Sequence, residues 1–276
     1  MIHLFVVLLF VFILLFVCWL NGKRLRSYFN SSVIVFGKKG TGKDLIFQYV
    51  INHSKKAQKD AYYSNLNYGG KFVETNVKDI SVNPNTFLTL IKGQYTQVDW
   101  AFHNKCDIFL SDGGIYLPSQ YDGTLDKLFP SFPIAYALSR QLNENNIHLN
   151  TQALGRVWLK VREQGEFYIK ANRTISIFGF LITFWTGFDR YQSALDDVRP
   201  MGGRIFNKFS KAEKDTFIAT HGYIKKGFIV QRKKNIKYDT FAFRYKLTTL
   251  QPPLSKSRFI LFKKNSIIKA WKNHEE

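Results

Sequence analysis

The segment from Gly37 to Asp44 (GKKGTGKD) places three glycines and three lysines within one short stretch. It follows an apolar run, Ser32–Phe36, which has the composition of a strand buried on both faces of a parallel sheet. Apolar residues then recur at helical spacing from Leu45 to Ile51. The sequence therefore predicts a strand, a glycine-rich loop and a helix in direct succession, which is the repeating unit of an α/β fold.

The loop fits the pattern G-x-x-x-x-G-K, in which glycines let successive backbone N–H groups turn toward a phosphate. The helix that follows directs its positive dipole end at the same charge, and Lys43 is expected to pair with the β- and γ-phosphates of ATP. Asp44 stands where Ser or Thr usually offers a hydroxyl to Mg²⁺; a carboxylate also ligates that ion. Lys38 and Lys39 would offset part of its charge. We expect nucleotide contacts from Gly37, Lys38, Lys39, Gly40, Thr41, Gly42, Lys43 and Asp44.

Strands and helices are predicted to alternate after the loop. The apolar runs Ala61–Asn65, Asp107–Ser111 and Ile147–Thr151 have the length and composition of buried strands. Helices are predicted from Asn83 to about Lys92 and over Ile134–Asn143. This alternation predicts an α/β fold, a P-loop NTPase with a mostly parallel sheet.

The pattern changes from about Val157, where short aromatic and β-branched runs predominate. They predict antiparallel additions to the sheet, and they lie at Phe167–Ile169, Thr174–Phe188 and Gly227–Val230. The longest of them, Thr174–Phe188, is interrupted by Gly179 and Gly187 and is too short for a membrane span. We predict that it forms a buried pair of strands.

Asp112 ends the apolar run that begins at Asp107, where an acid of the Walker B type would hold the hydration shell of Mg²⁺. The other reading is an Asp at a simple turn, which Gly113 and Gly114 would favour. Asp44 and Asp112 are thus the predicted metal ligands. Many ATPases place a Glu directly after this Asp, and here the position is Gly113, so a general base would come from elsewhere; Glu144 is one guess.

Gln152 follows the next predicted strand, where its side chain would contact the γ-phosphate or the attacking water. Arg140 and Arg162 are candidates for stabilising transition-state charge, in cis or from a neighbouring subunit. A surface glutamine and two solvated arginines are the alternatives. The predicted catalytic residues are Lys43, Asp112, Gln152, Arg140 and Arg162.

The N-terminal segment Ile2–Leu20 is apolar except for His3. As a helix it spans about 29 Å, at roughly 1.5 Å per residue, which matches the hydrocarbon core of a bilayer. Trp19 sits at the interface position, and the positive charges follow at Lys23, Arg24 and Arg26. A cleaved signal peptide would need a basic start and a small-residue cleavage site, which this segment lacks. We therefore expect a single-pass inner-membrane protein with its N-terminus outside and the nucleotide site in the cytoplasm.

The formal net charge of +20 indicates a polyanionic partner, either nucleic acid or an anionic membrane; a Lys-rich soluble surface is the alternative. Between Lys225 and Lys272 the only acid is Asp239, and aromatic residues are interleaved with the basic ones. Such a region would bind single-stranded nucleic acid, or would form a β-rich core with solvated or lipid-bound lysines. Cys18 and Cys106 have no metal spacing, and we expect both to be packing residues.

Several of these segments together resemble one family. They are the loop Gly37–Asp44, the strand ending at Asn65, the strand ending at Asp112, Leu138–Arg140, and Ile147–Gln152 with Val161–Gln164. Together they are similar to the zonula occludens toxin-like ATPases of filamentous-phage assembly. These belong to the FtsK/HerA-like P-loop group, and the resemblance covers roughly residues 31 to 190. It implies Lys43 as the Walker A lysine, Asp112 as the Walker B acid, Gln152 as the sensor, and Arg140 and Arg162 as the family's arginines.

The resemblance also implies partners: the membrane, single-stranded phage DNA or its nucleoprotein complex, an export channel or coat proteins, and further copies in a homo-oligomeric ring. This chain departs from the family because its predicted span precedes the ATPase domain, and because Asp44 and Gly113 replace the usual residues. The predicted parts are an anchor (1–22), a basic linker (23–30), an ATPase domain (31–190) and a basic, aromatic-rich extension (191–276). We expect export of single-stranded phage DNA; the alternatives are a DNA translocase of a mobile element and a membrane scaffold that binds nucleotide without hydrolysis.

Overall fold

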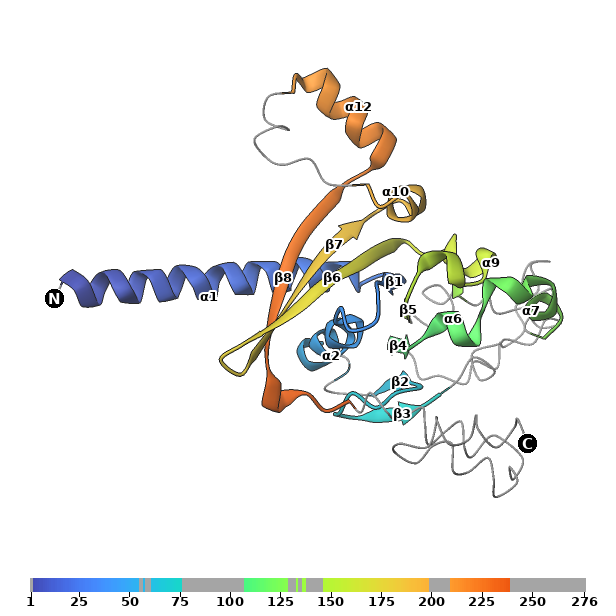
Figure 1. Ribbon diagram of the computed structural model, residues 1–276, viewed down its shortest axis with the longest axis horizontal. Helices are drawn as coiled ribbons and strands as arrows, with labels where there is room; N and C mark the ends of the chain where they lie inside the picture. Colours follow the sequence, from blue (N-terminus) through green and yellow to red (C-terminus); the bar gives the residue numbers. More distant parts are fainter. Residues whose placement is uncertain are drawn as a thin grey trace, which may run out of the picture. The chain divides into compact units, whose positions relative to one another are not determined.

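The computed structural model describes residues 2–54, 57, 61–75, 107–128, 133, 136–137, 146–198 and 209–238 (Figure 1). The chain divides into two compact units, Met1–Tyr238 and Asp239–Glu276, and the second lies wholly outside the described residues. The helix predicted from Asn83, most of the one predicted over Ile134–Asn143, and the part of the basic, aromatic-rich extension from Asp239 onward also lie outside them.

The described strands form one sheet in the order β3-β2-β4-β5-β1-β6-β7-β8. Every pairing from β3 to β6 is parallel, whereas β7 and β8 are antiparallel. The strands are β1 (Val33–Phe36), β2 (Tyr62–Ser64), β3 (Phe72–Glu74), β4 (Asp107–Leu110), β5 (Asn146–Thr151), β6 (Phe167–Ile177), β7 (Phe180–Phe188) and β8 (Ile224–Arg232). The predicted fold class, a mostly parallel sheet with antiparallel additions, is confirmed.

The central strands β1, β4 and β5 are buried at every residue, so their side chains form a core on each face of the sheet. One face carries Ile34, Ile108 and Leu149, which pack with Leu154, Trp158 and other residues that follow β5. On the opposite face, Phe109 meets Phe47 of α2 (Lys43–His53) at 5.1 Å between ring centroids. Helices thus cover both faces, as the near-continuous apolar strands predicted.

The remaining described helices are short, apart from α1 and α12. They are α1 (Ile2–Tyr28), α6 (Gly113–Tyr116), α7 (Asp122–Leu128), α9 (Leu159–Arg162), α10 (Tyr191–Leu195) and α12 (Lys211–His221), with 3-10 turns η1 (Ser119–Tyr121), η2 (Leu154–Arg156) and η3 (Lys233–Asn235). Ser210 and Glu213 form a capping box that defines the start of α12.

Within the described part of the chain, one helix is long and apolar enough to cross a membrane, and it is α1. Its apolar residues from Phe5 to Val17 are exposed, whereas Leu25 and Tyr28 are buried. Tyr28 packs edge-on against Trp185 of β7, with 6.0 Å between ring centroids. The helix therefore runs without a break through most of the predicted linker (23–30), because its last two turns belong to the core.

The antiparallel strands differ from the prediction in two respects. β6 is one continuous strand of 11 residues, with a bulge between Ala171 and Arg173, where the sequence suggested two separate runs. The predicted buried strand pair is correct as a hairpin, but its tip from Ser176 to Phe180 is exposed, because no described element packs over it. The sheet continues through β8, so the predicted boundary at 190/191 does not coincide with an edge of the sheet.

Candidate nucleotide site

The glycine loop joins β1 to the N-terminus of α2, as the sequence predicted. Gly40 and Gly42 have φ values of 80° and 97°, which side chains other than glycine rarely adopt. A Cβ on Gly42 would overlap with the hydroxyl of Thr174, whereas Gly40 has open space around it. The glycines are thus required for two different reasons, namely backbone conformation at both positions and close approach to β6 at Gly42.

Strands on either side hold the loop in place. The N–H of Gly37 donates to the carbonyl of Thr151 in β5 at 3.2 Å. The hydroxyl of Thr174 in β6 donates to the carbonyl of Thr41 at 3.0 Å, and it also meets the hydroxyl of Thr183 in β7 at 2.9 Å. The long strand β6, which the sequence did not predict as one element, therefore positions the loop.

Lys43 is the first residue of α2 and is 7% exposed. Its Nζ donates to the carbonyl of Lys38 at 3.3 Å, across the loop. Burial lowers the pKa of Lys43 below its usual value, and the carboxylates of Asp44 and Asp112 oppose that shift. The lysine is thus held at the helix N-terminus with its ammonium group beside two acids, whereas Lys38 and Lys39 are exposed.

Asp44, the departure from the usual motif, is the centre of a polar network. Its Oδ1 accepts hydrogen bonds from the hydroxyl of Tyr68 at 2.8 Å, from Ser111 Oγ at 3.1 Å and from Asn150 Nδ2 at 2.7 Å. All three donors reach the same oxygen, and among the described residues Oδ2 has no donor. The carboxylate thus connects α2 to Tyr68 and Ser111, which follow β2 and β4, and to Asn150 in β5.

Tyr68 and Ser111 are buried parts of this network and hydrogen-bond to each other. Burial, followed by the neighbouring Asp44 carboxylate, holds the pKa of Tyr68 well above its usual value, so its hydroxyl remains a donor. Ser111 is fixed in turn by Asn65, whose side chain exchanges two hydrogen bonds with the Ser111 backbone, at 2.8 and 2.9 Å. The end of the predicted strand at Asn65 is therefore part of the site.

Asp112 follows β4 in a left-handed conformation, with φ 53°. Its N–H donates to Asn150 Oδ1 at 2.8 Å, so Asn150 bridges the backbone of Asp112 and the carboxylate of Asp44. Burial, reinforced by the Asp44 carboxylate, raises the pKa of Asp112 above its usual value, and Lys43 opposes the shift. Within the described ranges the Asp112 carboxylate accepts no hydrogen bond, so both of its oxygens remain available as ligands.

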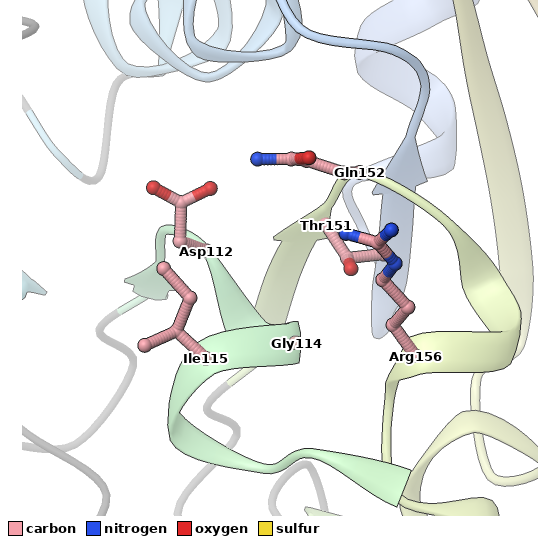
Figure 2. Close-up of a pocket in the computed structure, with 6 residues that line it drawn as sticks. All are labelled: Asp112, Gly114, Ile115, Thr151, Gln152 and Arg156. Carbon is pink, nitrogen blue, oxygen red and sulfur yellow. The ribbon is translucent and has the colours of Figure 1, made fainter.

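A pocket of about 50 Å³ lies at the ends of β4 and β5 (Figure 2). It is lined by Asp112, Gly114, Ile115, Thr151, Gln152 and Arg156. Figure 2 shows the Gln152 amide reaching from the end of β5 toward the side of the pocket that Asp112 occupies. Two predicted site residues, Gln152 and Asp112, thus line one pocket, and Arg156, which was not predicted, lines it with them.

Gly113 and Gly114 bring α6 close to β5. A Cβ on Gly113 would lie 3.3 Å from the carbonyl oxygen of Asn150, and one on Gly114 would lie 2.9 Å from Thr151 Oγ1. The position where many ATPases carry a Glu is therefore in close backbone contact with the neighbouring strand. No described residue takes that acid's place in the pocket lining, and Glu144 lies outside the described residues.

Neither predicted arginine is among the described residues that line the pocket. Arg140 lies outside the described residues. Arg162 is in α9, its guanidinium is 5.8 Å from the centre of the Tyr191 ring, and its backbone carbonyl accepts a hydrogen bond from Tyr168. Arg156 lines the pocket instead, because the turn η2 returns the chain to the end of β5.

The residues present fit Mg²⁺ bound together with a nucleotide. Asp112 offers two free carboxylate oxygens and Asp44 offers Oδ2, and their mutual repulsion contributes to the raised pKa of Asp112. Mg²⁺ is usually held by one or two carboxylates together with phosphate oxygens and water, not by a cage of protein ligands alone. The described residues contain no cluster of three or more potential metal-ligating side chains.

A glycine loop between β1 and α2, followed by an acid at the end of a nearby parallel strand, defines the P-loop NTPase fold. One strand, β5, lies between β1 and the strand that carries Asp112. This order places Asn150 and Gln152 between the loop and Asp112. The class of protein is therefore a P-loop NTPase with one N-terminal helix of membrane-spanning length.

Solved structures similar to this chain include the N-terminal domain of zonular occludens toxin from Neisseria meningitidis. It is 12% identical, with a TM-score of 0.39, and the match covers 65% of this chain and 99% of that one. Another is the genome packaging NTPase B204 from Sulfolobus turreted icosahedral virus 2 in complex with ATP-gammaS, at 13% identity and a TM-score of 0.35, over 76% and 96% of the two chains. The family that the sequence resembles is thus represented among these structures. A scan against protein-family models and a search of curated proteins found no match.

Proposed function

We propose that this protein is a membrane-anchored ATPase that couples ATP hydrolysis to the export of single-stranded phage DNA during filamentous-phage assembly. The observation that carries the enzymatic part is the meeting of three side chains at adjacent strand ends. Lys43 follows β1, Asp112 follows β4, and Gln152 follows β5, which lies between them. Lys43 and Asp112 interact electrostatically, and Gln152 lines the same pocket as Asp112.

Each of these side chains has a role that its position supports. The loop N–H groups and Lys43 would hold the β- and γ-phosphates, with the N-terminus of α2 directed at the same charge. Asp112 and Oδ2 of Asp44 would hold Mg²⁺, which neutralises phosphate charge when it is bound. Gln152 would orient the attacking water, and Arg156 would stabilise charge at the pocket mouth.

The membrane and DNA parts of the proposal are supported by α1 and by the charge of the chain. α1 exposes fifteen large apolar side chains between Phe5 and Leu20, and it is long and apolar enough to span a hydrocarbon core. The net charge of +20 suits a polyanionic substrate. The family resemblance implies a ring of copies, in which Arg140 or Arg162 would act on the site of a neighbouring copy.

The test is the steady-state ATPase activity of the full chain reconstituted in lipid vesicles, with and without single-stranded DNA. Lys43→Ala is expected to reduce turnover roughly 10²–10³-fold, as for the loss of one preorganised electrostatic group. Lys160→Ala is the matched control, because Lys160 is exposed and pairs only with Asp126 in the described structure. Turnover that DNA stimulates and Lys43→Ala abolishes supports the proposal; turnover insensitive to Lys43→Ala contradicts it.

A second candidate function is a membrane scaffold that binds ATP without turnover. Two observations favour it, namely the three hydrogen bonds that occupy Asp44 Oδ1 and the close packing of Gly113 against Asn150. Both features leave the site without the usual hydroxyl ligand and without the usual acid. Tight ATP binding that Lys43→Ala removes, combined with no turnover in the presence of DNA, would select the scaffold over the motor.

A further inference from the structure

The tip of the β6–β7 hairpin presents an apolar surface that the nucleotide site does not use. Phe178 is 96% exposed, and its neighbours Ile177 and Phe180 are 42% and 39% exposed. Ile177 pairs with Phe180, so the turn consists of Phe178 and Gly179 alone. Outside α1, Phe178 is the most exposed large apolar side chain among the described residues.

The backbone conformation of this turn is energetically unfavourable for a phenylalanine. Phe178 has φ 46° and Gly179 has φ 77°, the two positive values of a turn that favours Asn-Gly. An aromatic residue is unfavourable in the left-handed region, and a side chain this exposed recovers nothing from packing. The phenyl ring at this position therefore contributes nothing to the folded core, which points to a contact outside the described structure.

Basic side chains lie beside the tip and behind it along the hairpin. The guanidinium of Arg232 lies 5.9 Å from the ring centre of Phe180, and that of Arg173 lies 5.4 Å from the ring centre of Phe184. The N–H of Lys233 donates to the carbonyl of Gly179, which ties the basic run after β8 to the turn. The segments 167–188 and 224–238, which form these strands, contain no Asp or Glu.

The tip also lies on the side of the sheet from which α1 emerges. α1 crosses β8 at Gly227, where a Cβ would lie 2.8 Å from Asn21 Oδ1. Asn21 directly follows the apolar stretch that ends at Leu20, so β8 lies at the end of the candidate membrane span. Figure 1 shows the hairpin tip projecting from the sheet toward the side occupied by the N-terminal half of α1.

We propose that the β6–β7 hairpin tip inserts Phe178 and its apolar neighbours into the headgroup region of an anionic membrane, beside the anchor helix. Arg173, Arg232 and Lys233 would pair with lipid phosphates while the rings enter the acyl boundary, as in interfacial anchors. This inference rests on α1 crossing the membrane, which is part of the proposed function. Its consequence is a second attachment point, which would restrict rotation of the ATPase unit about α1.

The experiment uses the full chain with Cys18 and Cys106 replaced by Ala, at one copy per lipid disc. A fluorophore sensitive to polarity is attached after Ser176→Cys, Val11→Cys or Ile115→Cys substitution, in separate samples; Ser176 is exposed on the tip, and its replacement leaves Phe178 in place. Val11 reports on α1, and Ile115 is a matched control because it is 66% exposed and lies at the nucleotide pocket. The discs contain either phosphatidylglycerol or phosphatidylcholine, with brominated lipids as quenchers.

The label at position 176 is expected to show blue-shifted emission and quenching by lipids brominated near the headgroup, at a depth of roughly 5–10 Å. The effect should be weaker in phosphatidylcholine, and the label at position 115 should report water in both lipids. Quenching at position 11 without quenching at position 176 overturns the hairpin proposal and leaves the anchor intact. No quenching at either position contradicts both, and shielding at 176 that appears only with several copies per disc assigns the tip to a contact between copies.

A second variant separates membrane contact from folding of the hairpin. Phe178→Asn suits the backbone of the turn and should leave the hairpin folded. A label introduced by Ser176→Cys, on the same exposed tip, should be quenched by lipid in the parent chain and lose that quenching with Phe178→Asn. Equal quenching with and without Phe178 would show that the ring does not hold the tip at the membrane.

Discussion

Asn150 offers the sharpest test of the network that replaces the usual hydroxyl. It is 1% exposed, its Nδ2 donates to Asp44 Oδ1 at 2.7 Å, and its Oδ1 accepts from the N–H of Asp112 at 2.8 Å. The substitution Asn150→Ala removes both of these hydrogen bonds, together with the 3.1 Å bond from Nδ2 to Ser111 Oγ. It also leaves the buried N–H of Asp112 without its acceptor and deprives the Asp44 carboxylate of one of three donors.

The expected loss of stability follows from these two contacts. A hydrogen bond to a charged group contributes about 1.5–3 kcal/mol, and a buried N–H left without an acceptor costs about 1–3 kcal/mol. Together they give a loss of roughly 3–5 kcal/mol. For a unit of this size, 1 kcal/mol lowers Tm by about 2–4 °C, so we expect Tm to fall by roughly 10 °C.

The assay is thermal unfolding of the full chain in lipid discs at pH 7, followed by circular dichroism. Asn146→Ala is the matched control, because Asn146 lies in the same strand, is 6% exposed and, among the described residues, its side chain makes only a 3.4 Å bond to Asp107. The control should lose about 1 kcal/mol, or roughly 3 °C. If Asn150→Ala lowers Tm no further than Asn146→Ala, the network does not hold the site together and the reasoning is refuted.

An isosteric variant tests the charge directly. Asn150→Asp keeps the shape of the side chain but turns a carboxylate oxygen toward Asp44 Oδ1 in place of the donor. At neutral pH two adjacent carboxylates repel, so the loss of stability should equal or exceed that of Asn150→Ala. Protonation at low pH should return part of it, and a loss independent of pH would contradict the electrostatic cause.

Three further substitutions probe other parts of the site and the hairpin. Burial and Asp44 raise the folded-state pKa of Asp112, so its ionised form destabilises the fold increasingly as pH rises from about 4 through that pKa. Asp112→Asn should therefore raise Tm at pH 7 and not at pH 4; a lower Tm at pH 7 would contradict this cause. Gly42→Ala should lower the free energy of unfolding by about 2–3 kcal/mol, which is more than Gly40→Ala should lower it. Both glycines have positive φ, but only Gly42 also contacts a threonine of β6. Equal losses of stability in denaturant titrations would count against that contact. Phe178→Asn should raise the Tm of the detergent-solubilised chain by about 2–4 °C, since Asn suits the turn, and an unchanged or lower Tm would argue that the phenyl ring packs.

Much of the fold was predictable from local patterns. The run Ser32–Phe36, the glycine loop and the helical spacing after it predicted β1, the loop and α2 within two residues, because each depends on residues close in sequence. The apolar N-terminal stretch predicted α1 in the same way. The continuation of α1 to Tyr28 was not predicted, because the burial of Leu25 and the contact of Tyr28 with β7 stabilise this part of the helix, and both involve distant residues.

Candidate site residues could be predicted where a sequence motif specifies them. They could not be predicted where only tertiary contacts bring them to the site. Lys43, Asp112 and Gln152 were found from their places after apolar runs, since parallel strands bring such positions to one edge of a sheet. The strand order alone makes β5 the neighbour of both β1 and β4, and so gives Asn150 its bridge to Asp44. Tyr68, Asn65 and Arg156 carry no local signal for their roles.

The sequence by itself therefore determined the class of fold, the phosphate loop and the apolar N-terminal helix, because periodicity and glycine spacing act over a few residues. Only the tertiary structure decided what Asp44 does, why Gly113 stands where an acid is usual, and which arginine lines the pocket. Those properties depend on pairs more than thirty residues apart, such as Asp44 with Asn150 and Asp112 with Asn150. Such pairs meet only when the order of strands in the sheet is set, and burial then raises the pKa of Asp112 and supplies the donors around Asp44.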